Sequence, residues 1–169
     1  MIPKPRQTEG ASALEGRLVR VVDVDARIEE IYQNAHLTPI TVMICKLEDS
    51  RTFRLYYIPI EIVYAIKNLK EGFGEVPRNA RNSLFDILPY FESVIENFKS
   101  VIEKVVIDEL DEDSGLYTAK LFLNLGSVKL SIPMIPSHAI YLALITDKPI
   151  YVDEKLLERE YGEVGDYED

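Results

Sequence analysis

The stretch IPSHAIYLALITDKPIYVDE, residues 135–154, decides how the last part of the chain folds. Pro136 suits the first turn of a helix, because a backbone N–H at that position has no hydrogen-bond partner within the helix. The residues after it are apolar on nearly every side, which is typical of a helix that lies in a protein core. Pro-Ile-Tyr-Val then has the composition of a short strand. We therefore predict a buried helix over 136–145, a strand over 149–152 and a final helix that begins near Asp153.

The polar residues at the start of this predicted helix have two interpretations. Ser137 and His138 stand where a helix exposes free N–H groups, which attract anions. A histidine can also accept a proton near neutral pH, so both residues are candidates for a catalytic site. In the other interpretation they only satisfy local hydrogen bonds, as polar residues near helix ends commonly do.

Three apolar runs lie upstream of this helix and predict an antiparallel meander. IEKVVIDEL covers residues 102–110, LYTAKLFLNL covers 116–125 and VKLSIPM covers 128–134. The polar turns DEDSG and Gly-Ser separate them, as expected between neighbouring antiparallel strands.

An earlier block of the sequence has the same order of strands and helix. RLVRVVDV predicts a strand by its valine content, and PITVMICKL and TFRLYYI predict a hairpin across the polar EDSR. A helix follows, which Pro59 can start and Gly72 can end. The residues expected on its buried face are Ile62, Ala65, Ile66 and Leu69. This alternation predicts an α+β fold, a single domain with a mostly antiparallel sheet and helices packed on it.

The segment between the two blocks carries the clearest amphipathic pattern. Its apolar residues recur at helical spacing and are Leu84, Ile87, Leu88, Phe91, Ile95 and Phe98. Pro89 is expected to kink this helix or to split it in two. Ser83 and Asp86 have the spacing of a capping box, which predicts that the helix begins directly after Ser83.

The composition is that of one globular domain. The chain has 169 residues, of which 47% are hydrophobic and 28% are charged. We expect a flexible arm over 1–14, one domain over 15–159 and an acidic tail over 160–169. The single cysteine, Cys45, lies in the apolar run ITVMIC and is expected to be buried. No apolar run reaches the roughly 20 residues of a membrane span, and MIPKPRQTEG lacks a secretory signal, so we expect a cytoplasmic protein with no membrane partner.

The net charge of -10 is unevenly distributed along the chain. Residues 1–107 hold 14 basic and 15 acidic side chains, whereas residues 108–169 hold 5 and 14. The first part is thus nearly neutral and leaves room for a local basic surface that could bind nucleic acid. Its candidate residues are Arg51, Arg54, Arg78 and Arg81. The alternative is that these arginines are part of an ordinary solvated surface.

The order of these segments resembles the bifunctional nuclease domain family, from about Leu18 to about Glu158. The most specific part of the family pattern is Arg-Pro-Ser-Asp-Ala-Ile-x-Leu-Ala, a short loop, Pro-Ile-Tyr-Val and an acidic helix start. This chain keeps Pro136, Ser137, Ala139, Ile140, Leu142, Ala143, Pro149, Ile150, Tyr151 and Val152. It departs at Ile135, where the family has Arg, and at His138, where the family has Asp.

A second departure lies in the loop before the amphipathic segment. The family pattern there resembles Pro-Arg-Pro-x-Thr-His-Asp, whereas this chain reads Pro-Arg-Asn-Ala-Arg-Asn-Ser over residues 77–83. The Pro-Arg pair matches, and the Thr-His-Asp does not.

The resemblance implies a nuclease that cleaves phosphodiester bonds in DNA or RNA. Such a reaction needs a group that takes a proton from the nucleophile and positive charge beside the phosphate. The catalytic candidates are His138 and Ser137, and the candidates for binding nucleic acid are Arg78, Arg81, Arg51 and Arg54.

The turn DELDEDSG offers carboxylates for a divalent cation such as magnesium, the cofactor that phosphodiester cleavage often uses. The candidate ligands are Asp108, Asp111 and Asp113. The spacing is not that of an EF-hand, because Phe122 stands where the closing Glu would be. A solvated hairpin tip explains the same residues.

A second class of function also fits the sequence. The chain can be a non-catalytic oligomeric binding module that kept the fold and lost the family's polar site residues. Edges rich in tyrosine and apolar residues, such as FRLYYI, are costly to expose on a small domain, so we expect a homo-oligomer under either reading.

Overall fold

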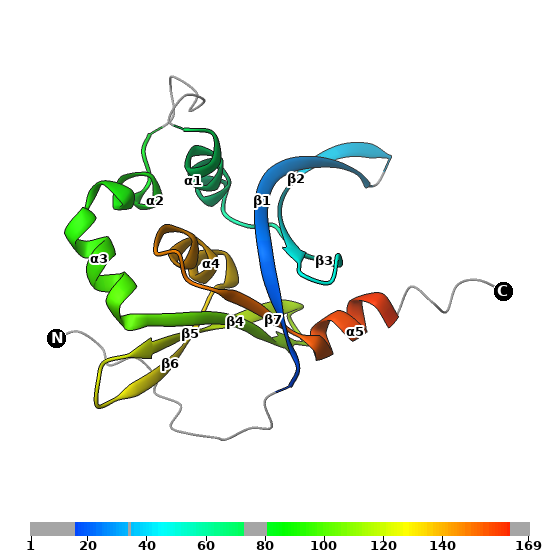
Figure 1. Ribbon diagram of the computed structural model, residues 1–169. Helices are drawn as coiled ribbons and strands as arrows, with labels where there is room; N and C mark the ends of the chain where they lie inside the picture. Colours follow the sequence, from blue (N-terminus) through cyan, green and yellow to red (C-terminus); the bar gives the residue numbers. More distant parts are fainter. Residues whose placement is uncertain (1–15, 34, 73–80, 163–169) are drawn as a thin grey trace.

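The computed structural model describes residues 16–33, 35–72 and 81–162, and the statements below concern these residues. A single mixed sheet runs through the molecule, and helices pack against it (Figure 1). The predicted N-terminal arm and most of the predicted acidic tail lie outside the described residues.

The sheet has seven strands in the order β3-β2-β1-β7-β4-β5-β6. They are β1 (Leu18–Gln33), β2 (His36–Leu47), β3 (Thr52–Tyr56), β4 (Ile102–Asp111), β5 (Leu116–Asn124), β6 (Lys129–Met134) and β7 (Ile150–Asp153). All neighbours are antiparallel except β4 and β7, which are parallel. The predicted meander, hairpin and mostly antiparallel sheet are therefore confirmed.

The helices are α1 (Ile60–Glu71), α2 (Leu84–Ile87), the 3₁₀ turn η1 (Leu88–Tyr90), α3 (Glu92–Val101), α4 (Pro136–Ile145) and α5 (Glu154–Gly162). In Figure 1, α1, α2 and α4 lie next to one another, whereas α5 follows β7 at the other end of the molecule. No helix in the described part of the chain is long and apolar enough to cross a membrane.

The two halves of the chain share one plan. In each half three antiparallel strands are followed by a helix, β1-β2-β3-α1 and then β4-β5-β6-α4. Strand β7 lies between the first strands of the two halves and joins them into one sheet. The strand and helix blocks of the sequence indicated this order, whereas the pairing of distant strands followed from no local pattern.

The sheet opens between β1 and β7 after a short contact. Only three residues of β1 pair with β7, and the last pair is Arg20 with Tyr151. Pro149, just before β7, has no N–H with which to continue the ladder. The pairing of β1 with β2 shifts register between Val21 and Asp23, and such a bulge bends a strand. Strand β1 therefore turns away from β7 and continues as a long hairpin with β2.

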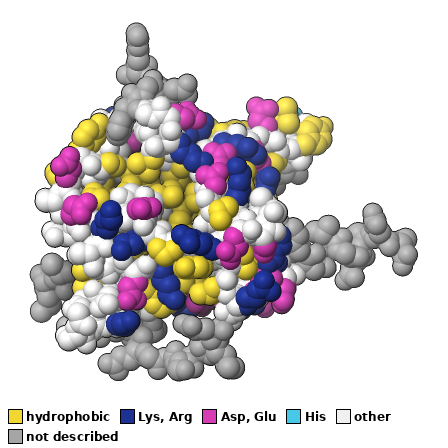
Figure 2. Space-filling model, viewed as in Figure 1, with side chains coloured by type: hydrophobic (Ala, Val, Ile, Leu, Met, Phe, Trp, Pro, Cys, Tyr) yellow, Lys and Arg dark blue, Asp and Glu magenta, His cyan; other side chains and the backbone are white. Residues whose placement is uncertain are grey.

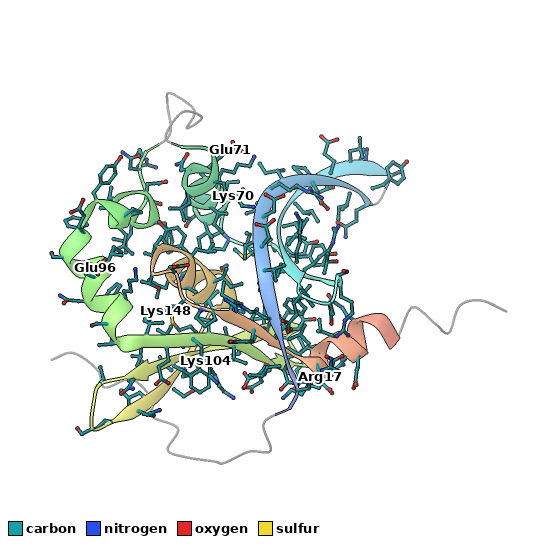
Figure 3. The ribbon with its side chains drawn as sticks, viewed as in Figure 1. Arg17, Lys70, Glu71, Glu96, Lys104 and Lys148 are labelled. Atoms are coloured by element: carbon teal, nitrogen blue, oxygen red, sulfur yellow. The ribbon has the colours of Figure 1, made fainter. Side chains whose placement is uncertain are left out.

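Side chains of all kinds meet on the face shown in Figure 2, where apolar, basic and acidic groups lie side by side. Figure 3 labels four cations on this face, Arg17, Lys70, Lys104 and Lys148, together with Glu71 and Glu96. The net negative charge of the chain therefore does not exclude basic groups from this surface.

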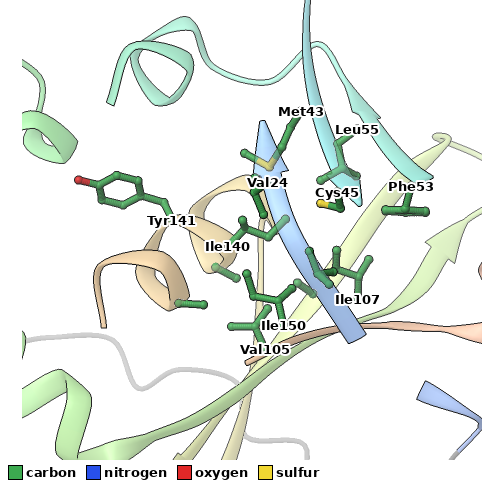
Figure 4. Packing of buried hydrophobic residues seen from close by; sticks show 14 of the residues in the cluster. Val24, Met43, Cys45, Phe53, Leu55, Val105, Ile107, Ile140, Tyr141 and Ile150 are labelled. Atoms are coloured by element: carbon green, nitrogen blue, oxygen red, sulfur yellow. The ribbon is translucent and has the colours of Figure 1, made fainter. Parts of the chain in front are cut away.

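Helix α4 is buried, as predicted from its apolar composition. Pro136, Ser137, Ala139, Ile140, Tyr141 and Ala143 are buried, while Leu142 and Leu144 are partly buried against the same core. Figure 4 shows Ile140 facing the strand residues of the core, whereas Tyr141 extends from the helix away from them. Cys45 is buried as expected, and its burial raises its pKa to about 12.

Two details of the predicted helices differ in the structure. Leu69, expected on the buried face of α1, is 39% exposed, because the last turn of α1 lies at an edge of the core. The amphipathic segment splits at Pro89 into α2, η1 and α3, and no residue of these three elements is fully buried. Phe85, Leu88 and Phe98 pack on the core, while Leu84, Tyr90 and Phe91 stay exposed.

Candidate active site

Helix α2 is held on helix α4 by a cluster of three rings. The ring of Phe85 meets the rings of His138 and Tyr141 edge to face, with centroid distances of 5.1 and 5.2 Å. The hydroxyl of Tyr141 donates a hydrogen bond to the backbone carbonyl of Phe85. Two segments more than fifty residues apart in the sequence thus meet at His138.

The start of α2 is fixed by the predicted capping box. The backbone N–H and the hydroxyl of Ser83 donate to Asp86 at 2.7 and 2.8 Å, and the Asp86 N–H donates to the Ser83 hydroxyl. The side chain of Asn68, buried in α1, also donates to Asp86, at 3.4 Å. This network sets the direction in which the chain enters α2, and therefore the position of Arg81 and Asn82 before it.

His138 lies in the first turn of α4 and is half-buried. Three of the four positions in this turn offer no free N–H. Pro136 has none, and those of His138 and Ala139 donate to the Ile135 carbonyl. The helix end alone is therefore a weaker anion site than the sequence suggested. Ile135, beside it, is 59% exposed, so the surface next to His138 is open to solvent.

Ser137 points into the protein. It is 2% exposed, and its hydroxyl has no hydrogen-bond partner among the described residues. A hydroxyl in this position cannot reach a phosphodiester in solution unless the helix moves. The structure therefore separates Ser137 from His138, although the two are adjacent in the sequence.

The predicted nucleic-acid-binding arginines do not come together. Arg51 donates to Asp49 and to Glu154 at 2.6 and 2.7 Å, and the bond to Asp49 lowers the pKa of that carboxyl. Arg54 forms an ion pair with Glu29 at 3.3 Å. Both arginines are thus already paired with carboxylates. Arg54 lies on strand β3, and Arg51 lies in the turn before it.

The other two predicted arginines belong to the loop before α2. Arg81 is exposed there, two residues before the Ser83 cap. Arg78 lies outside the described residues. Of the three arginines that the structure describes, Arg81 is the one near the start of α2.

The predicted metal ligands have other contacts. Asp108 accepts a hydrogen bond from Lys120 at 2.6 Å. Asp111 accepts bonds from the N–H groups of Asp113 and Ser114, which shape the turn between β4 and β5. The Ser114 hydroxyl, followed by these N–H groups, lowers the pKa of Asp111. Across the described residues, no group of three His, Cys, Asp or Glu side chains is arranged to hold a metal ion. Among the described residues, the three aspartates therefore do not form a preformed cation site.

Sequence reasoning missed the residues that assemble this site. The periodic pattern of the amphipathic segment did not include Phe85, Tyr141 was one of many apolar residues of its helix, and Asp86 was identified as a cap only. The one available signal was Tyr141, because a buried tyrosine usually needs a partner for its hydroxyl. Burial of this side chain also raises the pKa of Tyr141.

A family model described as the bifunctional nuclease domain matches residues 78–164, slightly more than half of the chain. The matched part includes α2, α4 and the ring cluster between them. Among curated proteins no significant relative was found.

Proposed function

Because the chain belongs to the bifunctional nuclease domain family, we propose that it is a nuclease that cleaves phosphodiester bonds in DNA or RNA at the contact between α2 and α4. The observation that carries this proposal is the packing of His138 against Phe85. It joins the two segments in which the family pattern has its polar residues.

In this mechanism His138 takes the proton of an attacking water. The water oxygen bonds to phosphorus, the bond from phosphorus to the leaving sugar oxygen breaks, and the leaving oxygen takes a proton from solvent water, while His138 later returns its proton to solvent. Arg81 compensates the charge that develops on the phosphate oxygens. Ser137 and the aspartates of the β4–β5 turn have no part in it, and no step runs through a metal ion.

The departures from the family pattern fit this arrangement. The pattern has a His in the loop and an Asp on the helix, whereas this chain has Asn82 in the loop and His138 on the helix. Since Phe85 follows the loop closely and contacts His138, a histidine on the helix faces the same region from the other side. Ser83 supplies the helix cap at the position where the pattern has its second Asp.

One observation favours the alternative, a binding module without catalysis. Leu84, Tyr90, Phe91 and Ile135 are each more than half exposed around this contact. Exposed apolar groups of this size are more typical of a binding surface than of a site for a charged substrate.

The test is a cleavage assay of the wild type on end-labelled DNA and RNA with magnesium, with manganese or with chelator. Cleavage in any arm supports the nuclease, and cleavage that survives chelator supports the mechanism without a metal.

Arg81→Ala should weaken binding to every sequence alike and reduce the salt slope by about one. Arg159 is an exposed arginine paired with Glu112, and Arg159→Ala is the matched control. This variant should change neither the affinity for nucleic acid nor its dependence on salt. If the wild type cuts neither nucleic acid in any arm, the binding-module alternative replaces the proposal.

A further inference from the structure

A groove opens where β1 turns away from β7. Its volume is about 570 Å³, within the usual range of small-molecule pockets. It is walled by residues 20–24 of β1, the last turns of α1 and the turn between α4 and β7. Neither His138 nor Arg81 lines it, so the groove is separate from the site proposed above.

The groove is a built feature of the sheet. The ladder between β1 and β7 ends at Arg20, and Pro149 has no N–H to extend it. Val22, which the register of β1 with β2 skips, is the bulge that turns the strand. Bulges of this kind are over-represented next to functional sites, where they redirect side chains.

The groove offers apolar surface to a ligand. Its floor includes Val24, Ile66 and Ile150, each at most 4% exposed. At its rim Val22 is 61% exposed and Leu69 is 39% exposed. A ligand with an apolar body would remove these two side chains from water, which is favourable.

The charge of the groove is positive although the chain as a whole is acidic. Its charged side chains are the cations Arg20, Lys70 and Lys148 and the anions Asp23 and Asp147. Two lysines share Asp23, since Lys70 and Lys46 lie 2.9 and 3.0 Å from its carboxylate.

Two of the three cations have no anionic partner in the part of the chain that the structure describes. The side chains of Arg20 and Lys148 form no ion pair with any other described residue, and the nearby Glu48 carboxylate bonds only the backbone N–H of Arg20. Lys70 and Lys148 stand on the same face of the molecule (Figure 3), where basic groups border apolar surface (Figure 2). An anion between Arg20 and Lys148 would complete this arrangement.

We propose that this groove binds a nucleoside monophosphate, with the phosphate between Arg20 and Lys148 and the nucleoside against Val22 and Leu69. The charge and the apolar rim specify an organic phosphate, while the choice of a nucleoside as its body rests on the proposed function.

Isothermal titration calorimetry of the full chain with adenosine 5′-monophosphate tests the proposal. We expect saturable binding with one site per chain, and weaker binding of adenosine and of inorganic phosphate. The double variant Arg20→Gln/Lys148→Gln should bind at least about tenfold more weakly, as expected for the loss of charged hydrogen bonds. Lys99→Gln, an exposed lysine of α3 outside the groove, is the matched control and should bind like the wild type.

A further variant tests the sign of the charge without risk to the fold. Asp147 has a φ of 53°, a conformation that Asn adopts readily, so Asp147→Asn removes one anion and keeps the turn. It should bind the nucleotide more tightly than the wild type.

Three results would overturn the proposal. In the first, the nucleotide shows no saturable binding. In the second, the double variant binds the nucleotide as tightly as Lys99→Gln does. In the third, inorganic phosphate binds as tightly as the nucleotide. His138→Ala should bind the nucleotide unchanged. Binding without nuclease activity would therefore reject the proposed function alone, and cleavage without binding would reject the groove alone.

Discussion

Ser83 shows how one side chain can set the geometry of the candidate site. It makes both bonds of a capping box with Asp86, and Asp86 is also held by Asn68 of α1. The direction in which the chain enters α2, and with it the place of Phe85 against His138, depends on this residue. The spacing of Ser83 and Asp86 predicted the cap, because a capping box is a local motif.

Replacing Ser83 by Ala should destabilise the protein by about 1 kcal/mol, the usual effect of losing an N-cap side chain. Ser83→Asp should restore most of that loss, because Asp is an equally good cap. The midpoint of urea unfolding measures both. Ser100→Ala, which removes an exposed hydroxyl from the end of α3, is the control and should change the midpoint little. Equal midpoints for Ser83→Ala and wild type would show that the cap is not needed.

Asp23 makes a pH-dependent contribution to stability. The hydrogen bond from Lys70, followed by that from Lys46, holds the pKa of Asp23 below its ordinary value. A carboxyl whose pKa is lower in the folded state stabilises the protein above its unfolded pKa of about 3.9, and this contribution is lost as the pH falls through the folded pKa. The stability difference between wild type and Asp23→Asn should be present at neutral pH and shrink in acid. Since the side chain of Asp23 is partly exposed, we expect this difference in the free energy of unfolding to be less than about 1 kcal/mol. Thermal unfolding across this pH range measures it, and a difference that does not change with pH would contradict the assignment.

At the scale of elements, the sequence predicted what depends on neighbours along the chain. Gly72 ends α1, Pro89 splits the amphipathic segment and Pro136 begins α4, because each effect is set by the local backbone. What it could not predict depends on distant partners. The parallel pairing of β4 with β7 and the opening between β1 and β7 are set by strands more than forty residues apart.

The same limit explains the errors in burial. Leu69 and Leu84 fit a helical apolar pattern, yet both are exposed. Periodicity identifies the apolar face of a helix, whereas the neighbouring elements decide how much of that face is covered. The ring cluster that joins α2 to α4 was missed for this reason, although His138 itself was a candidate from its place in the sequence.

The contact between α2 and α4 should depend on the hydroxyl of Tyr141. Tyr141→Phe leaves the Phe85 carbonyl without its donor, which should cost about 1–2 kcal/mol. The same variant should slow cleavage, because α2 is then held less firmly beside His138. Tyr32→Phe, which removes the hydroxyl of a side chain that is 76% exposed, is the matched control. Urea unfolding and the cleavage assay measure the two effects, and a variant that matches this control in both would contradict the role given to Tyr141.

At the scale of the whole molecule, we predict that the protein self-associates. Strand β3 forms one edge of the sheet, and Tyr56 and Tyr57 at its end are 49% and 69% exposed. An exposed edge with large side chains favours pairing with another chain. Light scattering at micromolar concentration should give a mass of two or more chains of 19.3 kDa each. Tyr56→Lys should lower this mass, while Tyr32→Lys, at the far end of the β1–β2 hairpin, should not. A monomeric mass for the wild type would rule the prediction out.

The central claim, that His138 takes a proton during phosphodiester cleavage, is tested most directly by the single-turnover cleavage rate of three proteins. They are the wild type, His138→Ala and His36→Ala, and the last removes the other histidine of the chain, which is exposed at the start of β2. A proton acceptor acts in the transition state, so His138→Ala should lower the rate by about 10²-fold or more and leave substrate binding nearly unchanged. His36→Ala should cleave like the wild type. Equal rates for His138→Ala and His36→Ala would contradict the claim.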